Sequence, residues 1–373
     1  MKLCITGGGT GGHLMVAEAL AKSAVAHGDE VIFIGSQKGQ DKQYFKDSPL
    51  FKKVYFLPSS GVVDKKGLYK ILSLWNIFKS FLRAREILKE NEIDATYSVG
   101  GFSAAPASFA TLNRSLPLFI HEQNAVKGRL NAVLKPFAKS FISAYDKSSP
   151  IKGYPVNSDF FKDARVRKEI RTVVFLGGSQ GARAINDLAL SLALELKDRD
   201  IKIIHQTGKN DYERVKEEYK VLNVDVALYS FTKEIGALIT QSDIAVSRAG
   251  ASTLWELTSN GLPTFYIPYP YAAGDHQFHN AQFIVENNLG WCEREDRDLK
   301  NDFLNILDED IEEKSYKLME YAVKDVADCH ISFTDSIPEF RFPDKYTFFV
   351  AAPGFFKFES IVRSDIDLDN VEF

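Results

Sequence analysis

Cysteine is scarce in this chain of 373 residues. Only Cys4, Cys292 and Cys329 occur, with no CxxC spacing and no even set that could pair. A disulfide framework or a cysteine-based zinc site needs more cysteines at more regular spacings. We therefore expect a protein of a reducing compartment, held together by its core without disulfides or structural zinc.

Long apolar runs and an excess of positive charge are also missing. No stretch approaches the roughly 18 apolar residues that span a bilayer, and Gly7 soon interrupts the apolar start of MKLCITGGGTGGH, which is too short for a signal peptide. The formal net charge of −4 argues against general nucleic-acid binding, because that binding needs a broad basic surface. These absences predict a cytoplasmic protein with no nucleic-acid partner.

The composition is that of a folded protein with two domains. Hydrophobic residues make up 45% and charged residues 26% of the chain, the balance of a globular protein, and the length suits two domains of roughly 150 to 200 residues. Short apolar segments alternate with helical stretches in two successive series. The strand candidates are residues 2–6, 31–35, 53–57, 94–99 and 117–120, then 172–176, 201–206, 224–229, 243–247 and 263–268. This alternation predicts an α/β fold of two Rossmann-like, doubly wound domains facing a cleft.

The domain boundary is placed where Gly, Pro and Asn interrupt the chain, near residues 153–158. The predicted divisions are an N-terminal domain over 1–155, a C-terminal domain over 156–330 and an atypical tail over 331–373. The tail is rich in aromatic residues and ends in an acidic stretch. It gives no confident fold, and its last ten residues are expected to be solvated.

A glycine-rich turn follows the first strand. Gly7, Gly9 and Gly12 satisfy G-x-G-x-x-G ahead of a helix over 14–27, so free backbone amides at a helix N-terminus could bind a phosphate. A dinucleotide site also needs an acid about 20 residues further on, at the end of the second strand. That strand ends in Gly-Ser-Gln at 35–37, which disfavours an NAD-dependent dehydrogenase.

His13 comes directly after this turn, in the first turn of the helix. A histidine there would be exposed to the cleft and would titrate near neutrality, so it could serve catalysis, acceptor binding or a local hydrogen bond. The segment VGGFSAAPA (99–107) is another strand, Gly-Gly turn and helix. Its Ser103 could contact an anionic group at the helix start, or the segment could be an ordinary tight turn.

Four polar residues, HEQN (121–124), follow the apolar strand LPLFI. The C-terminal ends of parallel strands present ligand-binding groups, and such a polar cluster is rarely pure scaffold. Glu122 could be a base or an orienting acceptor, and Asn124 could bind a hydroxyl.

The second half contains two further turns of this kind. GGSQGA (177–182) offers amides and the hydroxyl of Ser179 at a helix N-terminus, and SRAGASTLWEL (247–257) has small residues that leave room for a diphosphate beside the backbone. Glu256 lies on the helix after this last turn. It could accept hydrogen bonds from ribose hydroxyls or be a solvated helix residue.

The segment DHQFHNAQ (275–282) begins with an apparent N-cap, Asp275, and carries an HxxH pair at His276 and His279. The pair could ligate a metal. Because no further cysteine or acid beyond the cap is nearby, sugar-hydroxyl binding through Gln277 and Asn280 is favoured over metal binding.

Residues 65–89 are expected to form a basic amphipathic helix. Its basic residues are Lys65, Lys66, Lys70, Lys79, Arg83, Arg85 and Lys89, and its apolar residues at helical spacing are Ile71, Leu74, Trp75, Phe78, Phe81 and Leu82. Such a stripe could be core, or it could contact a surface of anionic lipid.

Taken together, GGGTGGH, VGGF, HEQNAVKGRLN, GGSQGARAIN, SRAGAST and DHQFHNA resemble the MurG family of GT-B glycosyltransferases, in the same order and over residues 1 to about 325. The resemblance implies transfer of N-acetylglucosamine from UDP-N-acetylglucosamine to the 4-hydroxyl of the muramyl sugar of lipid I, forming lipid II with inversion. It also implies a peripheral protein on the cytoplasmic face of an anionic inner membrane, with no cofactor and no metal required.

The resemblance further implies roles for particular residues. Catalysis falls to His13 and Glu122. The donor would contact Thr10, Gly11, Gly12, Asn124, Ser179, Phe231, Thr232, Ala251, Ser252, Thr253, Glu256, Gln277 and Asn280. The acceptor would contact Gly8, Gly9, His13, Gly100, Gly101 and Ser103. The membrane would contact Lys70, Trp75, Phe78, Lys79, Phe81 and Arg83.

Two departures from the family pattern stand out. Asn157 follows Gly-Tyr-Pro-Val where the family often has an arginine, and residues 331–373 do not resemble the family's C-terminal helix that returns to the first domain. Rival interpretations are a related GT-B enzyme with another lipid acceptor, a UDP-sugar epimerase, and a UDP-sugar-binding scaffold without turnover.

Overall fold

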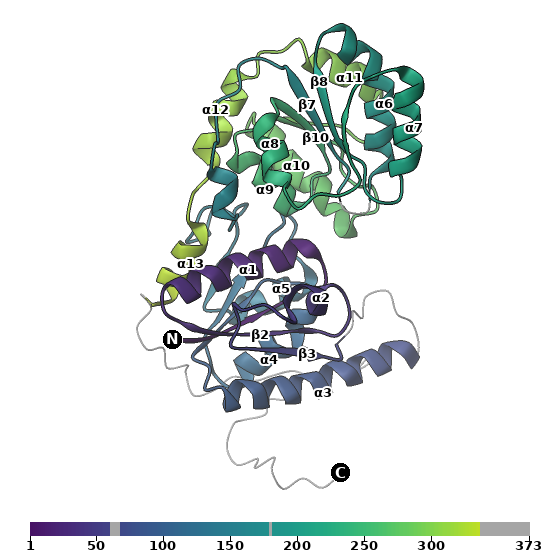
Figure 1. The fold of residues 1–373 in the computed structure, drawn as a ribbon. Helices are drawn as coiled ribbons and strands as arrows, with labels where there is room; N and C mark the ends of the chain where they lie inside the picture. The colour runs from purple at the N-terminus through teal and green to yellow at the C-terminus, as the bar shows by residue number, and fades with distance from the viewer. Residues whose placement is uncertain (60–67, 179–180, 336–373) are drawn as a thin grey trace, which may run out of the picture. The chain divides into compact units, whose positions relative to one another are not determined.

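The computed structural model describes residues 1–59, 68–178 and 181–335, without the side chains of residues 68–74 and 335. Two six-stranded sheets organise this part of the chain, in the orders β3-β2-β1-β4-β5-β6 and β12-β11-β10-β7-β8-β9. Every pairing within them is parallel. The predicted α/β class with two Rossmann-like halves is confirmed (Figure 1).

The described part of the first half contains one sheet and five α-helices. Its strands are β1 Lys2–Thr6, β2 Glu30–Ser36, β3 Lys53–Leu57, β4 Ala95–Ser98, β5 Leu118–His121 and β6 Ser140–Ile142. Its α-helices are α1 Gly11–Ala26, α2 Asp41–Phe45, α3 Leu68–Glu90, α4 Ala105–Asn113 and α5 Arg129–Leu134, with 3-10 turns η1 Phe102–Ala104 and η2 Lys135–Phe137. β1 and β2 are buried on both faces, so each is a mainly apolar run of residues. α1 covers one face, whereas α3 and α4 pack together on the other (Figure 1).

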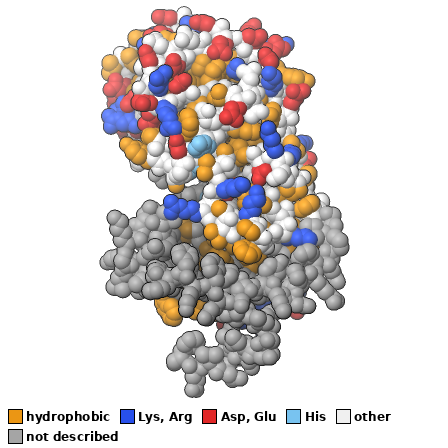
Figure 2. All heavy atoms as spheres, turned by 180° about the vertical axis from the view of Figure 1, so that it is seen from behind, with side chains coloured by type: hydrophobic (Ala, Val, Ile, Leu, Met, Phe, Trp, Pro, Cys, Tyr) orange, Lys and Arg blue, Asp and Glu red, His pale blue; other side chains and the backbone are white. Residues whose placement is uncertain are grey.

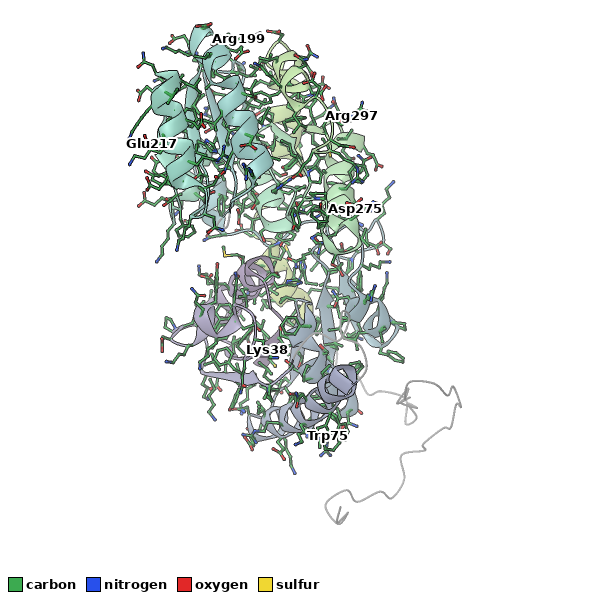
Figure 3. All side chains as sticks on the ribbon, turned by 90° about the vertical axis from the view of Figure 1, so that its right-hand side faces the viewer. Lys38, Trp75, Arg199, Glu217, Asp275 and Arg297 are labelled. Carbon is green, nitrogen blue, oxygen red and sulfur yellow. The ribbon has the colours of Figure 1, made fainter. Side chains whose placement is uncertain are left out.

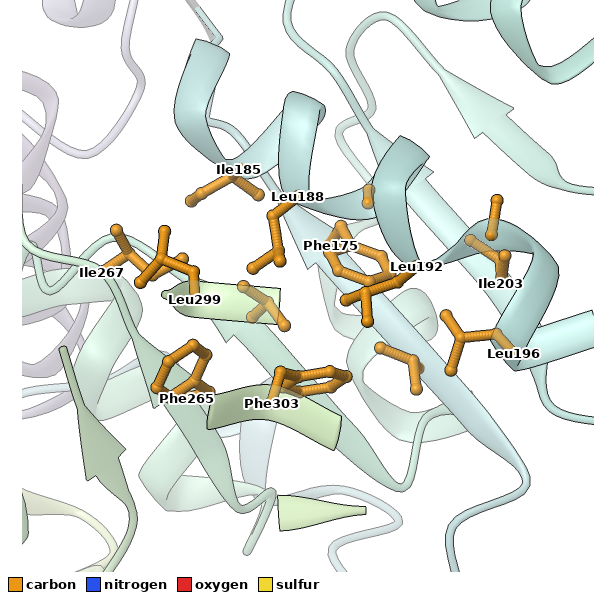
Figure 4. Packing of buried hydrophobic residues seen from close by; sticks show 14 of the residues in the cluster. Phe175, Ile185, Leu188, Leu192, Leu196, Ile203, Phe265, Ile267, Leu299 and Phe303 are labelled. Carbon is orange, nitrogen blue, oxygen red and sulfur yellow. The ribbon is translucent and has the colours of Figure 1, made fainter. Parts of the chain in front are cut away.

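The second half repeats this plan. Its strands are β7 Thr172–Leu176, β8 Lys202–Gln206, β9 Ala227–Tyr229, β10 Ile244–Ser247, β11 Thr264–Tyr266 and β12 Trp291–Cys292. Its α-helices are α6 Arg183–Asp198, α7 Tyr212–Leu222, α8 Ile235–Gln241, α9 Ala251–Ser259, α10 His276–Glu286, α11 Leu299–Ile306 and α12 Glu312–Tyr321, with 3-10 turns η3 Ser158–Phe161 and η4 Ala273–Asp275. Figure 4 shows its core, where Phe175, Phe265 and Phe303 meet the apolar face of α6. Both sheets therefore present the C-terminal ends of their central strands to glycine-rich turns.

The final described helix, α13 (Val326–Asp335), packs on the first half. The hydroxyl of Tyr97 in β4 donates to the carbonyl oxygen of His330 at 2.5 Å, and Ser23 of α1 donates to Asp328. The prediction that residues 331–373 do not form a helix returning to the first domain is therefore wrong for residues 331–335, which complete α13. The helix forms because Val326, His330 and Ile331 are buried on one side of it. The rest of the predicted tail lies outside the described residues.

Three further expectations concern cysteines, membranes and charge. Cys4, Cys292 and Cys329 are all free thiols. Among the described residues, no helix is both long and apolar enough to cross a membrane. On the face shown in Figure 2, acidic and basic side chains are intermixed over the second half. Nucleic-acid binding itself is not tested by this distribution, and its absence stays a prediction.

Candidate active site

The first glycine turn is closed by hydrogen bonds within the protein. Gly8 N donates to the carbonyl oxygen of Gly100 at 3.1 Å, and Gly9 N donates to Oδ1 of Asp41 at 2.5 Å. The expectation of free amides is thus wrong for Gly8 and Gly9, because two other loops supply acceptors. α1 itself begins without a side-chain cap or an acid in its first turn. The anion-binding capacity of this turn lies in the amides that open the helix.

His13 lies in the first turn of α1, as predicted, but it is half-buried rather than exposed. Its Nδ1 is 2.8 Å from the Thr10 hydroxyl. A Cβ placed on Gly100 would lie 3.4 Å from the far side of the ring, at Cδ2 and Nε2. Burial, with a smaller effect of His276, lowers the pKa of His13 to about 4. The ring is therefore neutral at neutral pH.

The second glycine turn packs directly against the first. Gly100 and Gly101 adopt φ of 88° and 79°, and a Cβ on Gly101 would lie 2.2 Å from the carbonyl oxygen of Gly8. No other residue fits there. Ser103 lies just beyond in η1, buried, and its hydroxyl has no hydrogen-bond partner in the described part of the chain. Its contact with an anionic group stays a prediction.

Glu122 organises the loop after β5. It is 3% exposed, and its carboxylate accepts hydrogen bonds from Asn124 N at 3.1 Å, Gly128 N at 2.8 Å and Asn131 Nδ2 at 2.9 Å. A carboxylate that accepts three hydrogen bonds is held in one orientation and in turn fixes the loop that supplies the donors. Of the two roles considered for Glu122, the geometry favours the orienting acceptor.

The start of α9 forms the matching feature of the second half. Gly250 precedes the helix in an extended conformation, no side chain caps the helix, and no acid lies in its first turn. Ala251, Ser252 and Thr253 supply the first-turn amides. A Cβ on Gly12 would lie 3.0 Å from the Ser252 hydroxyl, so the uncapped N-termini of α1 and α9 lie next to each other.

Glu256 follows on α9 and is half-buried. Burial raises the pKa of its carboxyl group to about 7. Within residues 1–59, 68–178 and 181–335 the structure records no hydrogen bond or ion pair of this side chain. A carboxylate without hydrogen-bond partners in the described protein can accept hydrogen bonds from a ligand, which suits the predicted contact with ribose hydroxyls.

Two other predicted donor contacts lie on the turns of this half. Phe231 is 44% exposed, with the Lys209 ammonium 5.7 Å from its ring centroid, and Thr232 accepts a hydrogen bond from Glu234 N at 3.0 Å. An exposed ring beside a cation can stack on a base. Ser179 lies outside the described residues.

α10 begins directly after Asp275, as predicted. Asp275 adopts φ of 54° and makes no capping hydrogen bond, because its carboxylate pairs with Arg294 at 2.6 Å. Asp275 is therefore the N-cap residue by position, but its side chain does not cap the helix. Gln277 Oε1 accepts a hydrogen bond from Tyr269 N at 3.0 Å. Among the described residues, no group of three or more His, Cys, Asp or Glu side chains is placed to hold a metal ion. The pair His276 and His279 is therefore not joined by a third ligand there.

Asn280 and Asn124, both predicted to bind the donor, bond to each other. Asn280 is fully buried. Its Nδ2 donates to Asn124 Oδ1 and to Ala249 O, each at 3.1 Å, and its Oδ1 accepts from Ala125 N at 2.8 Å. In this arrangement Asn280 joins the loop after β5 to the second half.

The exposed side of α3 carries aromatic and basic residues. Trp75 and Phe78 are 53% and 45% exposed and stack with ring centroids 5.9 Å apart; Figure 3 labels Trp75 on this helix. Phe81 packs against the core, and Arg83 pairs with acids of its own helix. A core role is thus wrong for Trp75 and Phe78. The side chain of Lys70 is not described.

Comparisons with known proteins agree with this arrangement. The profile of the "Glycosyltransferase family 28 N-terminal domain" matches residues 3–143, and that of the C-terminal domain matches residues 172–329. The crystal structure of Acinetobacter baumannii MurG superposes with a TM-score of 0.75 at 24% identity, covering 90% of this chain and 99% of that one. The UDP-N-acetylglucosamine--N-acetylmuramyl-(pentapeptide) pyrophosphoryl-undecaprenol N-acetylglucosamine transferase of Sulfurimonas denitrificans is 62% identical over 327 residues, covering 88% of this chain and 96% of that protein. The chain belongs to the MurG family.

Other similarities fit membership of the MurG family. The transferase of the same name from Wolinella succinogenes is 50% identical over 328 residues, covering 88% of this chain and 98% of that protein. A UDP-GlcNAc 2-epimerase of Neisseria meningitidis bound to UDP-GlcNAc has a TM-score of 0.59 at 14% identity, covering 90% of this chain and all of that one. At that identity the likeness shows the fold alone. The GT-B architecture is therefore shared with an epimerase, whereas the sequence is of the MurG family.

Two residues of this MurG-family site were not predicted from the sequence. Asp41 follows β2 and is fully buried against the first glycine turn. Tyr154 bonds through its hydroxyl to Gln123 at 3.2 Å and stacks on Trp255. An acid shortly after the second strand was a usable signal for Asp41. The sequence around Tyr154 contains no such signal, because its partners Gln123 and Trp255 are distant in sequence.

Proposed function

We propose that this protein transfers N-acetylglucosamine from UDP-N-acetylglucosamine to N-acetylmuramyl-(pentapeptide) pyrophosphoryl-undecaprenol, lipid I, and so forms lipid II. The observation that carries the proposal is the 62% identity to a transferase of that name along 96% of its length. The uncapped helix starts of α1 and α9 support it, since both substrates carry a diphosphate and each helix can bind one.

The donor belongs to the second half in this proposal. The first-turn amides of α9 and the hydroxyls of Ser252 and Thr253 bind the diphosphate, Glu256 accepts hydrogen bonds from the ribose, and Phe231 borders the uracil. As the bond from the sugar C1 to the β-phosphate oxygen breaks, negative charge grows on UDP. The helix N-terminus stabilises that charge without reorganisation, so the scheme requires no cofactor and no divalent cation.

The acceptor belongs to the first half, with His13 as the base. Because Nδ1 faces Thr10, Nε2 is the nitrogen left to receive the proton of the muramyl 4-hydroxyl as that oxygen bonds to C1. Attack opposite to the departing UDP inverts the configuration at C1. A pKa of about 4 is low for a base at neutral pH. The diphosphate of a bound acceptor raises it, because nearby negative charge favours the imidazolium.

The same proposal places the protein on a membrane. Its acceptor carries an undecaprenyl chain, and α3 offers the exposed rings of Trp75 and Phe78 beside Lys79, Arg83 and Arg85. Aromatic rings favour the interface, and basic side chains are attracted to anionic lipid. We infer peripheral attachment through α3 on the cytoplasmic face of the inner membrane.

A transfer assay tests the proposal. Radiolabelled UDP-N-acetylglucosamine and a short-chain lipid I analogue should give labelled disaccharide product, and EDTA should leave the rate unchanged. Binding of the donor without transfer would instead indicate a UDP-sugar-binding scaffold. Release of N-acetylmannosamine without transfer would indicate an epimerase, and either result would contradict the proposal.

A further inference from the structure

Asp41 is a buried acid in the middle of the acceptor half. It is fully buried at the start of α2, and no cation among the described residues forms an ion pair with it. Lys38, on the same loop, is exposed (Figure 3). A buried carboxylate without a cation needs hydrogen-bond donors to offset its lost hydration. Here the donors are two backbone amides.

Those amides belong to two different turns. Oδ1 accepts from Gly9 N at 2.5 Å and Oδ2 accepts from Ser36 N at 2.8 Å. The surrounding glycines leave room for the carboxylate, since a Cβ would lie 2.6 Å from it on Gly8 and 2.9 Å from it on Gly35. The turn after β1 is thus built around the Asp41 side chain.

The contact extends to the groups proposed to meet the acceptor. Gly9 follows Gly8, which bonds to Gly100, and Gly100 lies against the ring of His13. The loop that carries Asp41 also touches the turn directly, because a Cβ on Gly39 would lie 2.8 Å from Gly9 Cα. Asp41 itself is too deeply buried to reach a ligand.

We propose that Asp41 is a positioning residue for the acceptor: its carboxylate occupies the Gly9 amide and leaves only the opening amides of α1 to bind the acceptor's diphosphate. A diphosphate at the Gly9 amide would have to displace Asp41 and would meet its like charge. The diphosphate of the acceptor therefore has one binding position, which places the acceptor sugar beside His13. This inference rests on the proposed function.

The test compares two aspartates that bond to opposite ends of β1. Asp41→Asn puts an amide group where one of the two backbone donors needs an acceptor. Asp94→Asn is the control: Asp94 is exposed, and it also accepts from a backbone amide, Lys2 N at 2.7 Å, but at the end of β1 away from the glycine turn. KM for a short-chain lipid I analogue, KM for UDP-N-acetylglucosamine and melting temperature are measured for the full chain.

We expect Asp41→Asn to raise the acceptor KM at least about tenfold, the effect of losing one hydrogen bond to a charged group, with the donor KM within about twofold of wild type. Asp94→Asn should leave both KM values unchanged. An unchanged acceptor KM in Asp41→Asn, or an equal rise in both KM values, overturns the inference. Failure of the wild-type protein to transfer at all would instead overturn the proposed function.

A second variant covers the case in which Asp41→Asn does not fold. Gly39→Ala keeps the carboxylate but pushes its loop against the Gly9 backbone, at a residue with φ of 84°. It should shift the same turn and raise the acceptor KM, again without changing the donor KM. A donor KM that rises in parallel, or an acceptor KM that stays at the wild-type value, would contradict the positioning role.

Discussion

Reversing three charges on α3 should release the protein from anionic membranes while its chemistry persists. The variant replaces Lys79, Arg83 and Arg85 by Glu. Each basic residue near an anionic surface contributes about 1 kcal/mol. Loss of the three positive charges alone therefore weakens binding by about 3 kcal/mol, roughly a hundredfold, and repulsion of the three new carboxylates weakens it further. Arg83 contributes least, because Glu86 and Glu90 already pair with it.

The aromatic residues of the same surface provide a second perturbation. Trp75 and Phe78 are about half exposed, so changing both to Ser removes about 1 kcal/mol of burial each. This lowers the melting temperature of the first half, a domain of roughly 150 residues, by roughly 4–8 °C without unfolding it. Vesicle binding should also weaken in this variant, because it lacks the two aromatic rings that would contact the membrane interface.

Co-sedimentation with vesicles of anionic and of neutral lipid measures both effects. The control reverses three exposed lysines of the second half, Lys197, Lys202 and Lys220, which gives the same change in net charge. Transfer to a soluble acceptor analogue should stay near the wild-type rate in every variant. Unchanged sedimentation of the α3 charge-reversal variant, or an equal loss in the control, would refute α3 as the membrane site.

Three further predictions concern titratable residues. His13→Ala should lower kcat by about a hundredfold or more and leave the affinity for UDP-N-acetylglucosamine unchanged in calorimetry; equal loss of both would contradict the division between the two halves. Because the pKa of Glu256 is about 7 and an ionised carboxylate is the better acceptor for ribose hydroxyls, donor affinity should rise by up to about tenfold from pH 6 to pH 8, and Glu256→Gln should remove this dependence. Burial lowers the pKa of His205 from 6.5 to about 3, so the unfolded chain takes up a proton that the folded protein does not. His205 should therefore contribute about 2 kcal/mol to the fall in the free energy of unfolding between pH 7 and pH 5, and urea titrations should find the fall smaller by that amount in His205→Gln.

The strands that precede the glycine turns could be predicted because a strand buried on both faces is a continuous apolar run in the sequence. β1 and β7 are continuous runs of apolar residues, and the structure places them at the predicted residues. β6 and β12 escaped prediction. Each is a strand of two or three residues at the edge of a sheet, so its pairing depends on a neighbouring strand and not on its own pattern.

The sequence predicted which turns and helix starts carry the site residues, but not which side chains contact one another there. The helix start at His13 followed from the glycine pattern, whereas the half-burial of its ring depends on Gly100, which comes from another strand. Asp275 looked like a helix cap because nothing local revealed Arg294 as its partner. Asn124 and Asn280 bond across 156 residues of sequence, a distance over which spacing carries no information.

The contact between Tyr97 and His330 also bears on how the chain folds during its synthesis. Tyr97 is fully buried in β4, yet the carbonyl that accepts its hydroxyl is made 233 residues later. At roughly 5–20 residues per second, the ribosome needs about ten to fifty seconds to cover that interval. During this interval β5 and β6 are also made, but the first half still lacks α13 as a cover. A chaperone that binds nascent chains would find the side of β4 awaiting α13 open until nearly the whole described chain has left the ribosome.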